Sequence, residues 1–277
     1  MFDNFDYSLV DFGEGRKLER FGDLLVDRPS PQSICNKSYN KDIWDQVDAY
    51  FDREKGWILK DESSSDWEIS IFDSKVKLRF ASAGQVGIFP EQYENWDFLR
   101  KISLSMGEDE RILNVFSYTG VSNIALKGFG GEIVHLDGSK SSVNWAKENA
   151  RLNELKCKVR FIVEDAMTFM VKEVKRGKRY NGFILDPPEF GRGPGGDWSL
   201  KRDIELLTDI LNRITDRPRF FIFTTHSQWV DKKNLRKYLS RIDFLKKYLD
   251  IFELKIKSES GKFLDMGLCG RWSSIIV

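Results

Sequence analysis

Apolar and polar residues alternate over short stretches in the first hundred residues, with turn residues between them, and this pattern predicts β-strands. The segment WEISIFDSKVKLRF holds two such stretches that meet at Asp73-Ser74, which predicts a hairpin. A short helix is expected around Asp42–Phe51, and apolar residues at helical spacing predict a connecting helix over Tyr93–Leu104. Residues 1–105 are therefore expected to form a small β-rich N-terminal domain that includes the connecting helix.

From Arg111 onward, apolar strands alternate with helical segments. The strands are expected at RILNVF, EIVHLD, KVRFIV, YNGFILD and PRFFIFTT. Strands that alternate with helices predict right-handed βαβ units and a parallel sheet. Residues 106–277 are therefore expected to form an α/β domain built on a doubly wound, Rossmann-like sheet that is mostly parallel.

The last part of the chain begins with a helical stripe and ends with two strands. FELKIKS and LCGRWSSIIV are the two closing strands. The stripe contains Leu235, Tyr238, Leu239, Ile242, Leu245 and Leu249.

The composition is that of an ordinary globular protein, with 41% hydrophobic and 31% charged residues in a chain of 277. No stretch approaches the roughly 18 apolar residues of a membrane helix, and MFDNFDYSLV lacks the features of a secretory signal. Cys35, Cys157 and Cys269 match no zinc-binding spacing, so no metal site is expected. The net charge of +1 gives no general attraction to nucleic acid. We expect a cytoplasmic protein with no membrane partner.

Polar and acidic residues follow four successive predicted strands. The first strand ends in NVFSYTG, the second at Asp137, the third at Glu164-Asp165 and the fourth at Asp186-Pro187-Pro188. Open α/β sheets bind ligands in the crevice at the carboxyl ends of their strands. A carboxylate after the second strand can accept hydrogen bonds from both hydroxyls of a ribose, and one after the third from an adenine amino group. The first turn lacks GxGxxG, which makes a dinucleotide the weaker alternative.

The segments NVFSYTG, HLDGSKSSVNWAKENARLN, FIVEDAMTF and ILDPPEFGRGPGGDW resemble the class I S-adenosylmethionine (SAM)-dependent methyltransferases. The chain is most similar to the bacterial group related to the large-subunit ribosomal RNA cytosine-C5 and guanine-N7 methyltransferases, from about Gly87 to the C-terminus. GRKLERFGDLLVDRP also resembles the small β-rich domain of that group's shorter members, and no PUA-type RNA-binding domain is recognisable before the core. The resemblance implies SAM as cofactor and RNA, with ribosomal RNA favoured, as substrate.

The resemblance also implies a role for each matching position. Asp137 would bind the ribose, together with Gly138 and Ser139, and Asp165 with Ala166 would bind the adenine. The loop under the methionine part of SAM would consist of Phe116, Ser117, Tyr118, Thr119 and Gly120. The catalytic residues, facing the methyl group and the acceptor, would be Asp186, Pro187 and Pro188.

Some positions match the family less closely. In GIFPEQYENW, Gln92 and Asn95 match polar positions that family members place near the cofactor, whereas Tyr93 stands where an arginine is usual. Val121 and Ser122 depart from a pattern that is richer in glycine. The resemblance therefore implies a tighter first loop and a changed contact at residue 93.

Several of these residues have a simpler structural alternative. Asp137 and Asp165 could each only cap a helix, and the two prolines after Asp186 could only form a rigid turn. His135, inside a strand, is expected to be a packed core residue. His226 ends the fifth strand, where it could touch the acceptor or simply terminate the strand.

The sequence indicates less clearly which residues bind the methyl acceptor. Phe190 could stack on an acceptor base or belong to the core. Arg192 in the glycine-rich loop adds local positive charge for a substrate, whereas KEVKRGKR and KKNLRKYLSRIDFLKK are first interpreted as solvated helix faces. A small molecule or protein substrate, or a non-catalytic RNA-binding module, remain the alternative functions.

The acceptor atom decides which residues the chemistry needs. A nitrogen acceptor could be oriented by Asp186 and the Pro187 carbonyl, since methyl transfer depends largely on alignment. Methylation of pyrimidine C5 would normally need a cysteine thiolate. No cysteine lies beside DPPEF or TTH, and Cys269 is the least poor candidate.

Overall fold

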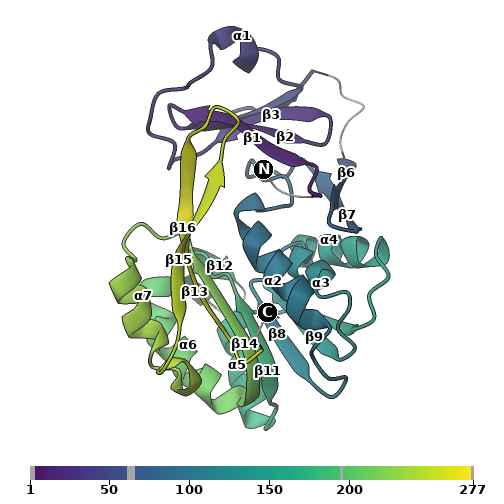
Figure 1. Ribbon diagram of the computed structural model, residues 1–277, viewed down its shortest axis with the longest axis vertical. Coiled ribbons are helices and arrows are strands. Elements are labelled where there is room, and N and C mark those ends of the chain that lie inside the picture. The colour runs from purple at the N-terminus through teal and green to yellow at the C-terminus, as the bar shows by residue number, and fades with distance from the viewer. Residues whose placement is uncertain (1–3, 61–65, 194–195, 276–277) are drawn as a thin grey trace. The chain divides into compact units, whose positions relative to one another are not determined.

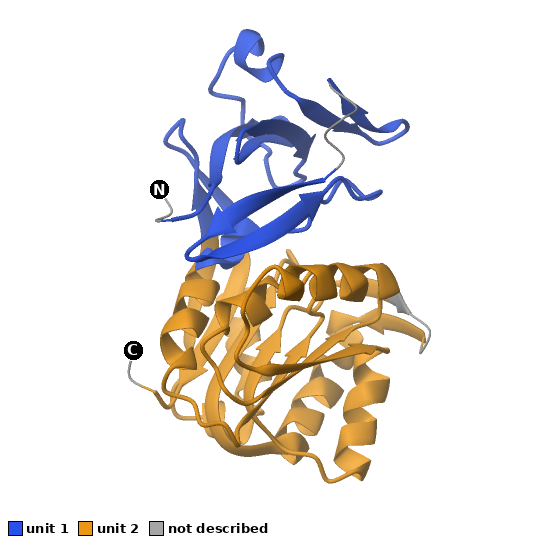
Figure 2. Cartoon of the chain, turned by 90° about the vertical axis from the view of Figure 1, so that its right-hand side faces the viewer, with its two compact units in different colours: residues 1–93, 255–266 blue, residues 94–254, 267–277 orange. Residues whose placement is uncertain are grey.

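The computed structural model describes residues 4–60, 66–193 and 196–275 (Figure 1). The chain divides into two compact units (Figure 2). Unit 1 contains residues 1–93 and 255–266, and unit 2 contains residues 94–254 and 267–277. The last two strands of the chain are thus divided between the units, and each unit is described by itself below. None of the described helices is both long enough and apolar enough to cross a membrane.

Unit 1 is built on a five-stranded sheet and a separate hairpin. The sheet has the order β1-β2-β3-β4-β5, and its strands are β1 (Tyr7–Gly13), β2 (Arg16–Phe21), β3 (Leu24–Pro29), β4 (Ala49–Asp52) and β5 (Gly56–Leu59). The hairpin consists of β6 (Asp66–Ile71) and β7 (Ser74–Arg79), as expected, but Phe72 and Asp73 form its turn, one residue before the predicted Asp73-Ser74. The two short helices are α1 (Lys41–Trp44) and η1 (Pro90–Gln92).

The helix expected over Asp42–Phe51 is mostly wrong. Helix α1 ends at Trp44, and the following apolar residues belong to β4. Ala49 and Phe51 are buried while Tyr50 between them is exposed, which is the period of two that a strand requires.

A fully buried group of charges crosses the first three strands of unit 1. Glu19 accepts hydrogen bonds from Arg28 and from the hydroxyl of Tyr7, and Lys17 Nζ lies 3.1 Å from its Oε1. The two cations hold the pKa of Glu19 at about 2, although burial alone would raise it. Burial also lowers the pKa of Lys17. Unit 1 therefore depends on a buried ion group as well as on apolar packing.

Unit 2 contains the seven-stranded sheet. Its order is β10-β9-β8-β11-β14-β16-β15, and the first five of these strands are parallel while β16 runs antiparallel to β14. The order steps outward from β8 in both directions, which confirms the doubly wound, mostly parallel sheet. The strands are β8 (Arg111–Val115), β9 (Glu132–Asp137), β10 (Lys158–Val163), β11 (Tyr180–Leu185), β14 (Thr215–Thr225), β15 (Asp250–Lys257) and β16 (Phe263–Ser273).

Helices cover both sides of this sheet (Figure 1). Helix α3 packs against α4, and α6 packs against both α5 and α7. A core cluster joins α5, α6 and α7 to the sheet through residues such as Phe169, Leu207, Leu235 and Phe221. The helices are α2 (Tyr93–Ser103), α3 (Val121–Ala125), α4 (Lys140–Arg151), α5 (Ala166–Lys175), α6 (Leu200–Ile214), α7 (Lys232–Leu239) and the short η2 (Asp243–Leu245).

Two segments after β11 differ from expectation. The helical stripe expected to reach Leu249 is one helix only as far as Leu239, although Ile242, Leu245 and Leu249 are still buried in the same core. The glycine-rich segment after the two prolines contains a small antiparallel hairpin, β12 (Phe190–Gly193) and β13 (Gly196–Ser199).

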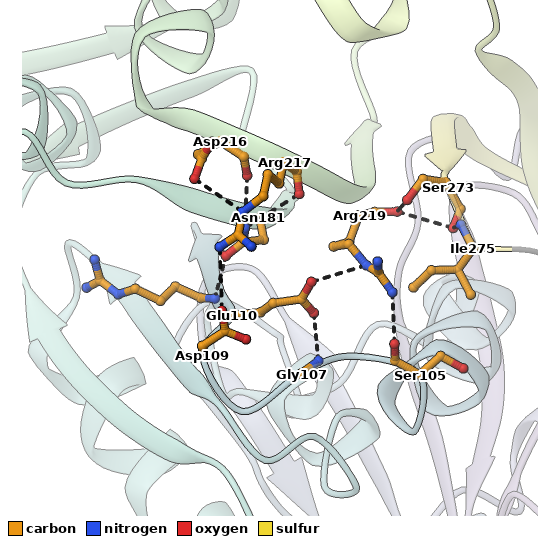
Figure 3. A network of polar contacts seen from close by, with 12 residues as sticks. Ser105, Gly107, Asp109, Glu110, Asn181, Asp216, Arg217, Arg219, Ser273 and Ile275 are labelled. Atoms are coloured by element: carbon orange, nitrogen blue, oxygen red, sulfur yellow. Dashed lines mark hydrogen bonds and ion pairs between the residues drawn. The ribbon is translucent and has the colours of Figure 1, made fainter.

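Polar contacts fix the amino ends of the central strands (Figure 3). Glu110 accepts a hydrogen bond from the Gly107 amide and pairs with Arg219 at 3.2 Å, and Arg219 also donates to the carbonyl of Ser105. Asn181 accepts from the Arg111 amide and donates to the carbonyl of Asp216. The amino ends of β8, β11 and β14 are therefore tied together.

Candidate active site at the carboxyl edge of the sheet

Backbone hydrogen bonds join the carboxyl ends of four neighbouring strands. The amide of Glu164 donates to the carbonyl of Asp137, and the amide of Ser117 donates to the carbonyl of Leu136, both at 3.2 Å. The amide of Asp186 donates to the carbonyl of Val115 at 3.4 Å. The polar residues after β10, β9, β8 and β11 therefore follow one another along a single edge.

The loop after β8 has an unusual backbone. Phe116, Tyr118 and Gly120 have positive φ angles of 58°, 49° and 79°. Such angles are costly for residues with a side chain and are concentrated at functional sites. At Gly120 a Cβ atom would lie 3.1 Å from the Cβ of Ala146 on α4, so the loop also requires a small residue there. The loop is therefore held in a tight turn.

Asp137 fixes this loop through its carboxylate. Its Oδ2 accepts from the amide of Tyr118 at 2.9 Å, and its Oδ1 accepts from the amide of Ser139 at 2.8 Å. Ser139 caps α4 with its hydroxyl, so the cap of that helix is not Asp137. Burial raises the pKa of Asp137 although the two amides lower it. The carboxylate is therefore partly removed from water, and the two backbone hydrogen bonds do not fully offset the cost of this desolvation.

Buried polar residues of β8, α3 and β9 form a chain of hydrogen bonds next to the loop. Asn114 on β8 donates to Asn123 on α3, and Asn123 in turn donates to Nδ1 of His135, each at 2.9 Å. Burial lowers the pKa of His135 to about 3, so the ring is neutral and its Nδ1 can accept. His135 is therefore a packed core residue, as expected.

The third strand end places Asp165 at the start of α5. Its Oδ1 accepts from the amide of Thr168 at 2.8 Å, so Asp165 is the N-cap of α5. Ala166, next to Asp165, is buried. Gly138, which follows β9, is exposed, and a Cβ added there would lie 3.9 Å from the carbonyl oxygen of Glu164.

Asp186 lies in a polar group formed with β14. Thr224 donates its hydroxyl to Asp186 Oδ1, and His226 Nε2 lies 3.3 Å from the same oxygen. Thr224 is buried, whereas the side chains of His226 and Asp186 are 30% and 26% exposed. The sequence did not single out Thr224, since its role depends on the pairing of β11 with β14.

The hairpin β12–β13 shapes the edge beside Asp186. Pro187 is buried and Pro188 exposed, and the indole of Trp198 donates to the Pro188 carbonyl at 2.7 Å. Trp198 also packs on Phe116 with the ring centroids 5.2 Å apart. Phe190 is 70% exposed, so the core alternative for this residue is wrong. Arg192 belongs to β12, and its side chain lies outside the described part of the chain.

The remaining candidates are distributed over both units. Gln92 is a buried residue of unit 1, in η1. Asn95 is a buried residue of unit 2, and its Oδ1 lies 3.4 Å from both Cys269 Sγ and Arg271 Nη1. Burial raises the pKa of the Cys269 thiol to about 12.

Comparisons with known proteins agree with this architecture. The family model for S-adenosylmethionine-dependent methyltransferases matches residues 46–217. The ribosomal RNA large subunit methyltransferase I of Tolumonas auensis is 33% identical over 138 residues, which are 48% of this chain and 34% of that protein. The ribosomal RNA large subunit methyltransferase K/L of Alteromonas mediterranea is 37% identical over 200 residues, 71% of this chain and 27% of that protein.

The chain thus spans about a third of the length of these two relatives. A crystal structure of a SAM-dependent methyltransferase from Agrobacterium tumefaciens is similar over nearly the whole chain, with a TM-score of 0.88 and 31% identity. That similarity covers 98% of this chain and 91% of the other. By its sequence and by its fold, the chain belongs to the S-adenosylmethionine-dependent methyltransferase family, whose cofactor is SAM.

Proposed function

We propose that the protein transfers a methyl group from SAM to a nitrogen of an RNA base, with ribosomal RNA as the favoured substrate. Relatives named as ribosomal RNA methyltransferases support the choice of RNA. The observation that carries the choice of a base is Phe190, an aromatic ring that is 70% exposed four residues after Asp186. Base–aromatic stacking stabilises unpaired nucleotides by about 1–3 kcal/mol per base.

The chemistry of Asp137 fits the cofactor. A carboxylate has about four lone-pair directions. Within the described part of the chain, only the amides of Tyr118 and Ser139 donate to Asp137, and burial raises its pKa. Two ribose hydroxyls would supply the missing donors and stabilise the ionised form. We therefore assign Asp137 to the ribose of SAM, with Gly138 and Ser139 beside it.

The neighbouring strand ends would hold the rest of the cofactor. We assign the strained turn of Phe116, Ser117, Tyr118, Thr119 and Gly120 to the methionine part, because its backbone is held in place by Asp137 and by β9. Asp165 and Ala166 are assigned to the adenine: Oδ1 of Asp165 caps α5, and Oδ2 can accept from an amino group. Gln92 is assigned a contact with the cofactor by family likeness alone.

The acceptor would lie beside Asp186. When bound, SAM supplies a methyl group already activated by its sulfonium. The protein's contribution is then to align the acceptor nitrogen, through the carboxylate of Asp186 and the carbonyl of Pro187. Trp198 holds the carbonyl of Pro188 and so keeps this segment in place. Phe190 would stack on the base, and Arg192 would add positive charge for the RNA backbone.

The state of the cysteines favours nitrogen over pyrimidine C5 as the acceptor. C5 methylation requires a thiolate that attacks the ring. Cys269 is fully buried, donates to Asn95, and has its pKa raised to about 12. Cys157 is buried before β10 with its pKa raised to about 11, and Cys35 belongs to unit 1. A thiolate in unit 2 would therefore be scarce at neutral pH.

The test is methyl transfer from tritiated SAM to ribosomal subunits, compared with soluble protein and small-molecule extracts, followed by mass spectrometry of the labelled nucleoside. We expect label in RNA, on a nitrogen. Asp186→Ala should lower kcat by at least about tenfold and leave SAM affinity within about twofold, because the residue serves the acceptor. Label in protein or small molecules would refute the RNA substrate, and a C5-methylated pyrimidine would refute the acceptor atom.

A further inference from the structure

Two side chains of β14 and the segment after it hold one oxygen of Asp186. The hydroxyl of Thr224 donates to Oδ1, and Nε2 of His226 lies 3.3 Å from the same atom. Thr224 belongs to β14, the strand next to β11, and His226 follows directly after that strand; Leu185 pairs with Phe223 just before Thr224. The carboxylate therefore has a fixed direction at an edge that a substrate can reach.

This direction matters for the proposed transfer to nitrogen. The lone pair of the acceptor nitrogen forms the new N–C bond, the C–S bond of the donor breaks with its electron pair left on sulfur, and the nitrogen then loses its proton. The ionised carboxylate of Asp186 can orient the N–H and take up that proton, and then release it to water through its exposed part. A carboxylate that rotates freely would be aligned only part of the time.

We propose that Thr224 and His226 are positioning residues for Asp186: two donors on Oδ1 orient the carboxylate, so that it can accept the acceptor's N–H. This inference rests on the proposed function. A carboxylate can accept about four hydrogen bonds, so both contacts are compatible with a bound acceptor. Neither residue needs to touch the substrate.

The other groups near this pair are already engaged. In the register of β14 with β16, Thr224 pairs with Cys269 and Ile222 with Arg271. Cys269 is protonated and donates to Asn95, while Arg271 donates to Asn95 and to the carbonyl of Glu94. The carboxylate of Asp186 faces the ring of His226.

Kinetics of matched variants test the positioning role. His226→Phe keeps a ring but removes the donor, and it should lower kcat by about 10- to 100-fold with KM and SAM affinity within about twofold. His226→Gln keeps an N–H donor and should recover most of the loss. Thr224→Val should behave like His226→Phe and Thr224→Ser like the wild type, while Gln228→Ala, an exposed neighbour, is the control. Equal losses for Phe and Gln at position 226, or equal losses in kcat and SAM affinity, would overturn the proposal.

A titration of the imidazole tests the pair without any turnover. The chain has two histidines, and burial lowers the pKa of His135 to about 3, so an imidazole that titrates at a higher pH in an NMR spectrum is assigned to His226. Removing a neighbouring carboxylate makes an imidazole give up its proton at lower pH. Asp186→Asn should therefore lower the midpoint by about one pH unit. An unchanged midpoint would overturn the pair even if the protein methylates RNA, and a shifted midpoint without RNA methylation would refute the proposed function alone.

Discussion

Asp137 shows how a single residue can be both structural and available to a ligand. Its two oxygens each accept one backbone amide, from Tyr118 and from Ser139, and burial still raises its pKa. The amides stabilise the carboxylate, but they do not replace all the water that it lost. A ligand with two hydroxyl donors would complete the set.

We expect Asp137→Ala to weaken SAM binding by about 1.5–3 kcal/mol, which is roughly a 10- to 150-fold change in Kd. Isothermal calorimetry measures it directly. Asp231→Ala, which removes the N-cap of α7, is the control, since it should cost about 1 kcal/mol of stability and leave SAM affinity unchanged. An unchanged affinity in Asp137→Ala would remove this residue from the cofactor site.

Cys269 gives a second prediction for a single residue. Cys269→Ser keeps a small hydrogen-bonding side chain beside Asn95, so kcat should stay within about twofold of the wild type. Methyl transfer to the RNA substrate provides the measurement. A loss of several hundredfold would instead indicate a nucleophilic thiol and C5 chemistry.

The positions of individual residues were predicted best where the residue comes directly after a strand. Asp137, Asp165 and Asp186 all lie at the sheet edge where the sequence placed them. The sequence did not single out Thr224, which donates to Asp186. It placed His135 in the core but did not predict its hydrogen bond with Asn123. Their hydrogen bonds join segments that are distant in sequence, and no local spacing reveals which pairs will meet.

At the scale of elements, the close approach of β11 to β14 is a demanding packing feature. Gly182 pairs with Phe220, and a Cβ added at Gly182 would lie 2.3 Å from the Phe220 ring. Phe220 is fully buried, so the ring has little room to move aside.

Gly182→Ala should therefore destabilise the protein by about 1–3 kcal/mol, the usual cost of overpacking. Urea unfolding at equilibrium gives the value. The double variant Gly182→Ala with Phe220→Leu should lose less stability than the sum of the two single variants, because the shorter side chain makes room. Additive losses would mean that the strand moves apart instead.

Elements were predicted well where hydrophobic runs were long and uniform. The strands β8, β9, β10, β11 and β14 lie at the expected segments. The prediction that the helix continues past Leu239 is wrong. The helical spacing of apolar residues continues through a turn and η2, because these residues are also buried in the core. Glycines in the segment after the two prolines suggested a loop and concealed β12 and β13.

At the scale of the whole molecule, each unit has its own source of stability. Unit 2 has the large apolar core, whereas unit 1 buries Lys17, Glu19 and Arg28 together. Removing one partner of such a group leaves the others buried and uncompensated, at a cost of about 3–5 kcal/mol. Glu19 is the member that both cations share.

Glu19→Gln should thus destabilise unit 1 by about 3–5 kcal/mol and leave SAM binding measurable. The pKa of Glu19 is lowered to about 2, so its contribution is present above the ordinary value of about 4.3 and is lost as the pH falls toward 2. Urea unfolding between pH 2 and 7 should show this acid dependence in the wild type and a weaker one in Glu19→Gln. The same acid dependence in both proteins would mean that other carboxylates cause it.

The division of β15 and β16 between the units constrains how this protein could be shortened or recombined. Residues 255–266 belong to unit 1, while the strand portions on either side of them belong to unit 2. A deletion of residues 1–93 would leave Ile256 and Leu264, both buried in the intact chain, at the tip of a protruding ribbon and open to aggregation. Unit 1 consequently cannot be removed by deleting the N-terminal residues alone. Any transplant of unit 2 would also have to replace the tip of this ribbon with a short turn.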